Sequence, residues 1–277
     1  MTAVGMLSVG LLRVGGVGVV VRTNCELFAA SAGSVFADLL AEGPIGSVSV
    51  PPVVFEVSCQ PAGEHRWSIT RDGAPCEMSL SDDGVLPHLQ WELNRLMIEM
   101  NPTSVHAAAV SGPTGGVLIA GRSCSGKSTL AGWLAVHHGF GYLGDEVGAI
   151  NEAGEVLPFP RPVGVRAESP LAGLVSDWAG EAERVLPIST LGGVVCRTPT
   201  LVSLLVFPRF QAGMRTPVLA RVGQAESLMR LAELTPGLGV YGRVVFEQLA
   251  RLAGTTPAFD VVYGHVADGA RLVAARA

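Results

Sequence analysis

The 277-residue sequence contains a single lysine, Lys127, although it contains 18 arginines. Charged residues are also scarce, at 16% of the chain, and the net charge is −5. A nucleic-acid partner needs cations gathered along a phosphate track, whereas these arginines are scattered singly, so the composition argues against such a partner. Because arginine serves wherever positive charge alone is enough, the one lysine needs a specific explanation.

Cysteine pairs with the spacing of a zinc site are missing as well. The cysteines are odd in number, widely spaced and form no CxxC pair, which favours reduced thiols in a cytoplasmic protein over disulfides. They are Cys25, Cys59, Cys76, Cys124 and Cys196.

An uninterrupted apolar run of membrane-helix length is also missing. The most apolar stretch, residues 3–21, contains Arg13 and five glycines, and no basic residue precedes it. A spanning helix or a signal peptide would be less interrupted and differently flanked. We therefore predict strands here and no membrane partner.

Residues 1–100 are predicted to form a β-rich subdomain that ends in a helix. Residues 53–59 have strand composition. In residues 66–80, apolar and polar side chains alternate on either side of the Asp72-Gly73 pair, which indicates a hairpin. Exposed strands in this subdomain could mediate assembly, so a homo-oligomer is possible.

The helix that ends this subdomain is marked by a change in the spacing of its apolar residues, from the alternation of a strand to the period of a helix. It follows the capping candidates Asp82 and Asp83 and stops at Asn101-Pro102, where we place the boundary to a second domain, residues 101–277. Its predicted core face consists of Leu86, Leu89, Leu93, Leu96, Met97 and Met100.

The second domain alternates strands with helices, which is typical of the α/β class. We predict strands at 105–110, 117–120, 141–150, 201–207 and 259–264, and helices at 127–138, 224–234 and 243–253. The core-facing positions of the first of these helices are Leu130, Trp133, Leu134 and His137.

The segment GRSCSGKS, residues 121–128, matches the phosphate-loop pattern GxxxxGK[ST] between a strand and a helix. Its glycines let backbone N–H groups point inward as an anion site, and the helix N-terminus adds a positive dipole. The predicted nucleotide-binding residues are Gly121, Ser123, Cys124, Ser125, Gly126, Lys127, Ser128 and Thr129. Lys127 would hold the β- and γ-phosphates as a compact charge, whereas the fork of arginine is too large and rigid for this position. Ser128 would bind Mg²⁺, so the implied cofactors are ATP and Mg²⁺.

Cys124 lies inside this loop and allows two interpretations. It could be a redox-sensitive thiol near a helix start, or a small residue at a variable loop position, and we favour the second.

His106 is predicted to lie beside the loop although it precedes it in the chain. Residues 105–120 fold naturally as a hairpin about Pro113-Thr114, and pairing across that turn places His106 opposite Gly121 within two residues of register. A catalytic or phosphate-contacting role for His106 follows.

Asp145 and Glu146 fall in the predicted strand at 141–150. Adjacent strand residues face opposite sides, so we expect only one of the two to face the nucleotide, and we favour Asp145. A carboxylate there could bind Mg²⁺ or accept a hydroxyl proton, and Glu146 is a further metal-ligand candidate. The alternative is an acidic turn without a chemical role.

The combination of HAAAV, GRSCSGKST and LGDEV resembles the P-loop kinases related to HPr kinase/phosphorylase. It is most similar to their shorter relatives in peptide and natural-product biosynthesis, including lasso-peptide kinases, and the resemblance covers about residues 86–277. It implies a fold akin to the phosphoenolpyruvate carboxykinase nucleotide-binding domain and ATP-dependent phosphorylation of a serine hydroxyl. By this resemblance, His106 is the family histidine ahead of the loop, and Asp145 is the catalytic base.

The chain departs from the family pattern at two places. Glu146 stands where aspartate is usual, and the segment that carries another metal-side carboxylate in HPr kinase is not visible. The weak candidates to replace that segment are Arg161, Arg166 and Glu168. Because of these departures from the family pattern, HPr itself is an improbable acceptor.

The resulting prediction is a Mg-ATP-dependent kinase that acts on a hydroxyl of a small peptide or metabolite. The alternative is a nucleotide-binding accessory protein of a biosynthetic pathway that transfers no phosphate. An ABC-type or motor ATPase is weaker, because no LSGGQ-like signature is present and the strand at 201–207 does not end in aspartate. The resemblance alone leaves reversal of the reaction with inorganic phosphate open.

Overall fold

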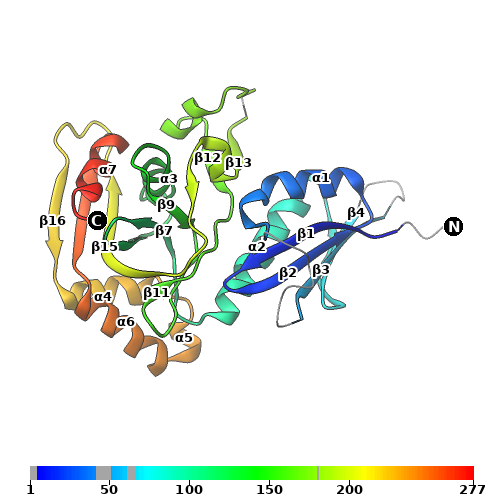
Figure 1. Ribbon diagram of the computed structural model, residues 1–277, viewed down its shortest axis with the longest axis horizontal. Coiled ribbons are helices and arrows are strands. Elements are labelled where there is room, and N and C mark those ends of the chain that lie inside the picture. Colours follow the sequence, from blue (N-terminus) through cyan, green and yellow to red (C-terminus); the bar gives the residue numbers. More distant parts are fainter. Residues whose placement is uncertain (1–4, 42–50, 61–65, 180) are drawn as a thin grey trace. The chain divides into compact units, whose positions relative to one another are not determined.

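The computed structural model describes residues 5–41, 51–60, 66–179 and 181–277 (Figure 1). The chain divides into two compact units, residues 1–96 and 97–277, and the division falls within helix α2 (Asp82–Met100). Both units mix helices with sheets, so the structure has the mixed α/β character that the sequence predicts.

The first unit is built on a five-stranded sheet with the order β1-β2-β3-β4-β5. The predicted N-terminal strands are confirmed as a hairpin that turns at Gly15 and Gly16, and the predicted hairpin turns at Asp72 and Gly73, both with positive φ. The strands are β1 (Leu7–Val14), β2 (Val17–Thr23), β3 (Val53–Gln60), β4 (Arg66–Arg71) and β5 (Ala74–Leu80).

Helix α1 (Glu26–Val35), followed by the short η1 (Ala37–Leu39), was not predicted from the sequence. Its small and polar residues show no clear helical period, and tertiary packing stabilises it instead. Phe28 stacks against Trp67 with ring centroids 5.3 Å apart, and Trp67 Nε1 donates a hydrogen bond to Asp82 Oδ1 at 2.6 Å. These contacts join α1, β4 and the start of α2.

The predicted core face of α2 is correct for Leu89, Leu93, Leu96 and Met97, which are buried. It is wrong for Met100, whose exposed fraction is 42%, because the helix ends there. Asp82 and Asp83 lie in the first turn of α2 rather than before it.

The second unit is built on a large sheet with the order β14-β9-β7-β8-β15-β17-β16. Strand β15 pairs in parallel with β8 and with β17, whereas β7 pairs antiparallel with β8 and β9. The strands of this sheet are β7 (Ala107–Gly112), β8 (Gly115–Ala120), β9 (Gly141–Gly144), β14 (Val194–Val195), β15 (Thr200–Phe210), β16 (Val218–Val222) and β17 (Ala258–Tyr263), and β11 (Glu155–Val156) pairs with β15.

Helices cover both faces of this sheet (Figure 1). One hydrophobic core joins it to α3 (Lys127–His137) and α7 (Val266–Ala274), and the other joins it to α4 (Gln224–Glu233) and α6 (Arg243–Thr255). The short helix α5 (Leu238–Tyr241) precedes α6. Sequence reasoning missed α7 and also β16.

Two predicted strands of this unit are interrupted. The strand at 105–110 divides at His106 into β6 (Ser104–Val105) and β7. The strand at 141–150 ends at Gly144 and resumes as β10 (Gly148–Ala149), which pairs with β6. The predicted core position of His137 is also wrong, because this side chain is exposed and stacks on Trp133.

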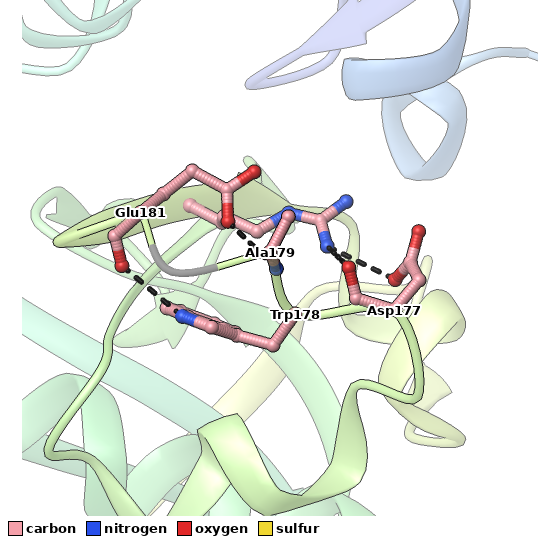
Figure 2. Close-up of polar contacts among 5 residues, drawn as sticks. Asp177, Trp178, Ala179 and Glu181 are labelled. Atoms are coloured by element: carbon pink, nitrogen blue, oxygen red, sulfur yellow. Dashed lines mark hydrogen bonds and ion pairs between the residues drawn. The ribbon is translucent and has the colours of Figure 1, made fainter.

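A hairpin of β12 (Val163–Arg166) and β13 (Glu183–Leu186) was not predicted, and the short η3 (Pro170–Leu174) lies between its strands. Figure 2 shows polar contacts that hold the connection before β13. Trp178 Nε1 donates to the Glu181 carbonyl at 3.1 Å, and Arg184 donates to Asp177 Oδ1 at 3.0 Å. The short η4 (Ile188–Leu191) follows β13.

Among the helices that the structure describes, none combines the length and the apolar character needed to cross a membrane. All five cysteines are free thiols.

Candidate functional site

Residues 121–126 form the loop that connects β8 to α3. Cys124 and Gly126 adopt positive φ values of 64° and 97°, and no side chain caps the N-terminus of α3. The loop is anchored from behind, since Phe210 N donates to the Ser125 carbonyl at 3.1 Å and Tyr263 Oη donates to the Gly126 carbonyl at 3.2 Å. An uncapped helix N-terminus preceded by such a loop is suited to bind a phosphate.

Lys127 is the first residue of α3, and its exposed fraction is only 3%. Its Nζ lies 3.1 Å from His106 Nε2 and 3.1 Å from the Arg122 carbonyl. Burial lowers the pKa of the Lys127 ammonium, and the nearby Asp145 and Glu146 carboxylates oppose that shift. The single lysine therefore lies over the loop and close to both predicted carboxylates.

The predicted position of His106 beside the loop is confirmed. Ala107 pairs with Ala120 across the β7–β8 hairpin, and Gly121 N lies 3.4 Å from the His106 carbonyl oxygen to which it donates. His106 N donates to the Leu234 carbonyl at 2.7 Å, which joins this residue to the end of α4.

The imidazole ring of His106 bridges Lys127 and Glu146. Its Nδ1 lies 3.3 Å from the Glu146 carbonyl oxygen and 3.3 Å from Glu146 Oε2, while Nε2 faces the lysine. A neutral ring with its proton on Nδ1 satisfies all three contacts, because Nε2 then accepts from the ammonium.

Asp145 and Glu146 do not lie in a strand as predicted. Strand β9 ends at Gly144, Val147 N donates to the Asp145 carbonyl at 2.8 Å, and Glu146 has a φ of 65°. The expected alternation of side chains therefore does not apply, and both carboxylates lie near Lys127. The chain leaves the sheet here because residue 144 packs tightly on residues 158–160, where a Cβ at Gly144 would lie 2.5 Å from the Phe159 carbonyl oxygen.

Asp145 has one carboxylate oxygen without a partner. The residue is 3% exposed, and its Oδ1 has no hydrogen-bond partner among the described residues. A buried carboxylate oxygen without a partner is costly unless a proton or a cation satisfies it.

The residues of this site fit Mg²⁺ only together with a phosphate ligand. Within the part of the chain that the structure describes, no group of three or more histidine, cysteine, aspartate or glutamate side chains could hold a metal ion. Mg²⁺ is usually bound by one or two carboxylates, substrate phosphates and water. The Asp145 carboxylate, with its oxygen that has no partner, and the hydroxyl of Ser128, the second residue of α3, are oxygen donors of the type that Mg²⁺ takes.

The segment around β12 brings Arg166 to the loop. An Arg166 guanidinium nitrogen lies 3.8 Å from Cys124 Sγ, and Arg166 Nε lies 3.8 Å from Glu183 Oε2. Arg166 thus places a positive charge beside the exposed part of the loop, while Glu168 follows directly after β12.

A pocket of about 380 Å³ lies beside the first residues of the loop, and sequence reasoning missed it. The loop contributes Gly121, Arg122 and Ser125, β15 contributes Arg209, α4 contributes Glu233, and Leu234 follows directly after α4. No short-range sequence pattern marks this pocket, because it forms where the carboxyl ends of the parallel strands β8 and β15 meet at one edge of the sheet.

No protein-family model and no curated protein matches this sequence.

Taken together, the site can bind a polyphosphate and can move a proton. The loop and Lys127 provide anion-binding groups, and Asp145 provides a carboxylate oxygen without a hydrogen-bond partner. His106, held by Glu146, provides a second group able to accept a proton once Lys127 turns to a phosphate.

Proposed function

We propose that the protein is a Mg-ATP-dependent kinase that transfers the γ-phosphoryl group to a hydroxyl, with serine-like hydroxyls as the expected acceptors. The observation that carries this proposal is the convergence of Lys127, His106, Asp145 and Glu146 at the end of the phosphate loop. A loop alone would support nucleotide binding, whereas the added histidine and carboxylates supply what phosphoryl transfer needs.

We further infer that residues 101–277 form a P-loop nucleotide-binding domain of the HPr kinase/phosphoenolpyruvate carboxykinase-like type. Its support is the order of β8, loop and α3, with β7 placing His106 beside the loop.

In the proposed reaction, the amides at the start of α3 and the Lys127 ammonium hold the phosphates. Lys127 exchanges its bonds to His106 and to the Arg122 carbonyl for phosphate oxygens, which have a higher negative charge. Bound Mg²⁺ would neutralise charge on the β- and γ-phosphate oxygens, with Ser128 and Asp145 as its protein ligands.

Asp145 is the proposed proton acceptor, because one of its oxygens lacks a hydrogen-bond partner. The other carboxylate, Glu146, is engaged by His106, whose ring it orients. His106 Nε2, released by Lys127, would then contact the transferred phosphoryl group or the acceptor hydroxyl. Catalysis of this kind depends mainly on positioning and charge neutralisation.

The test separates binding from turnover. Calorimetry measures ATP affinity with and without Mg²⁺, and a coupled assay measures ADP release with a panel of hydroxyl acceptors and without any acceptor. Asp145→Asn should bind ATP without Mg²⁺ within about 3-fold of the wild type, and with Mg²⁺ it should lose at least about 100-fold in turnover, because general-base catalysis contributes roughly 10²–10⁴-fold.

The matched variant is Glu146→Gln, which keeps the size of the side chain and a hydrogen-bond acceptor for His106. It should retain more activity than Asp145→Asn. Tight ATP binding without ADP release under any condition would instead support a nucleotide-binding accessory protein.

A further inference from the structure

The pocket beside the loop shares two residues with the site. The Arg122 carbonyl accepts a hydrogen bond from the Lys127 ammonium, the Leu234 carbonyl accepts one from His106 N, and Arg122 and Leu234 also line the pocket. A ligand there lies next to the groups that would hold the γ-phosphate.

The nucleoside has a different place available. Phe210 is 51% exposed and packs edge-to-face on Tyr263 at 6.1 Å between ring centroids, and Tyr263 in turn holds the Gly126 carbonyl. Because neighbouring strand residues point to opposite faces, Phe210 and Arg209 lie on different sides of β15. A base can stack on Phe210 and leave the Arg209 side free for the acceptor.

One wall of the pocket is held by a paired arginine. Arg230 donates to Asp260 Oδ1 at 2.6 Å and to Oδ2 at 3.3 Å, and it also pairs with Glu226. Its guanidinium lies 5.0 Å from the centre of the Phe207 ring. Arg230 is therefore a fixed part of the wall and not a free ligand-binding group.

The rim of the pocket is narrowed by an ion pair. Arg122 from the loop lies 3.4 Å from Glu233 of α4, and the two side chains are 84% and 61% exposed. The pair joins the loop to α4 on the solvent side of the pocket.

Arg209 is the lining cation that remains available. Among the described residues, no carboxylate lies within ion-pair distance of its guanidinium, although it lines the same pocket as Asp260 and Glu233. An arginine fork without a partner binds a carboxylate through two parallel hydrogen bonds.

We propose that this pocket is the acceptor site and that the acceptor is a small hydroxy acid whose carboxylate binds Arg209. The proposal rests on the kinase function above. A volume near 380 Å³ lies at the low end of ligand pockets and suits a molecule the size of an amino acid or sugar acid. The acceptor oxygen forms a bond to the γ-phosphorus, the bond from that phosphorus to the β–γ bridging oxygen breaks, the hydroxyl proton passes to Asp145, and ADP leaves.

The test uses the full chain with Mg-ATP and matched acceptors. L-serine and glycerate carry a carboxylate, serinamide and glycerol are their counterparts without a carboxylate, and the peptide Ala-Ser-Ala represents a larger acceptor. At least one of the two acids should stimulate ADP release, and its counterpart without a carboxylate should be about 10-fold or more weaker in kcat/KM. Arg209→Met should raise the KM for that acid by about 10- to 100-fold, as expected for loss of a charge-assisted pair, and leave the KM for ATP within about 2-fold. The control Arg243→Met changes an exposed arginine on α6 and should alter neither constant.

Three results would overturn the proposal. Equal stimulation by the compounds without a carboxylate would exclude a role of the carboxylate, and stimulation by the peptide alone would assign a peptide acceptor. A raised KM for ATP in Arg209→Met would assign the pocket to the nucleotide.

Calorimetry with L-serine and glycerate measures binding to the pocket directly, so that a failure of this proposal can be distinguished from a failure of the kinase function. Binding that Arg209→Met abolishes, without any ADP release, would support the pocket and refute the kinase. Absence of both binding and stimulation, in a protein that still hydrolyses ATP, would refute the pocket alone. If neither the whole panel of hydroxyl acceptors nor ATP alone gives ADP release, both proposals are wrong.

Discussion

Lys127 is one lysine among 19 lysine and arginine residues, and its side chain is almost fully buried. Its ammonium lies 3.1 Å from both His106 Nε2 and the Arg122 carbonyl oxygen. The guanidinium of an arginine is larger, planar and more rigid than this ammonium. Under the proposed function, a compact charge that can turn from these partners to a phosphate would account for the use of lysine here and arginine elsewhere.

We expect both Lys127→Met and Lys127→Arg to weaken ATP binding by at least about 10-fold, because each removes the compact charge-assisted contact to phosphate. Isothermal titration of Mg-ATP measures the effect. The reverse exchange Arg243→Lys at an exposed position is the control and should bind as the wild type does. Normal binding by Lys127→Arg would show that charge alone is sufficient at this position.

Tyr263 links stability to pH. Burial raises the pKa of its phenol above the ordinary value near 10, so between about pH 10 and that raised pKa the unfolded chain releases a proton that the folded chain keeps. Stability from this group is therefore complete below about pH 10 and is lost as the pH rises above it.

In urea unfolding at pH 8, Tyr263→Phe should be less stable by about 0.5–1.5 kcal/mol, since it loses the hydrogen bond to the Gly126 carbonyl. Above pH 10 the wild type should lose about 1.4 kcal/mol per pH unit relative to this variant. A difference that stays constant from pH 8 to pH 11 would contradict the assigned pKa shift.

Two local elements decide where the site residues meet. The β7–β8 hairpin brings His106 to Gly121 through its register, and this register could be predicted because the Pro113-Thr114 turn and the apolar pairs specify it. The turn after β9 could not be predicted, because it depends on packing of Gly144 against Phe159, which is distant in sequence.

The junction of loop and α3 depends on Gly126. This residue has a φ of 97°, and a Cβ there would overlap Tyr263 Oη. Gly139 has a φ of 71° with nothing within 4 Å of an added Cβ, so Gly139→Ala measures the backbone strain alone.

Gly139→Ala should cost about 1–2 kcal/mol of unfolding free energy, and Gly126→Ala should cost more. In the double variant Gly126→Ala/Tyr263→Phe, part of the extra cost should be recovered, because the added Cβ would then face the ring at 3.4 Å from Cζ. Chemical denaturation of the wild type and these three variants measures the differences in unfolding free energy. Equal losses in Gly139→Ala and Gly126→Ala would exclude an overlap of the added Cβ with Tyr263.

The molecule as a whole consists of two compact units, and all residues of the candidate site and of the adjoining pocket belong to the second. Each unit has buried side chains of its own, such as Phe55 and Ile69 in the first and Leu118 and Leu205 in the second. A ligand that binds only the second unit stabilises that unit through mass action.

We expect Mg-ADP to slow hydrogen exchange in residues 121–130, 144–147 and 205–210, with the hairpin at 66–80 as the internal reference. At 100 times Kd the added stability is about 2.7 kcal/mol, or roughly 100-fold slower exchange where global unfolding of the unit limits it. Protection at 66–80 equal to that at 121–130 would contradict a ligand site confined to the second unit.

The sequence by itself determined the glycine-containing loop between a strand and a helix, the hairpin that places His106 beside it and the mixed α/β character, because short-range patterns carry each of these features. It missed α1 and α7, and it placed Asp145 and Glu146 in a strand that ends before them. Only the tertiary structure decided that both carboxylates lie near Lys127 and that Arg166 reaches Cys124. Only the tertiary structure, again, formed a pocket with Arg209 from the end of β15. These features bring together segments separated by tens of residues, and packing between elements, rather than local periodicity, sets such contacts.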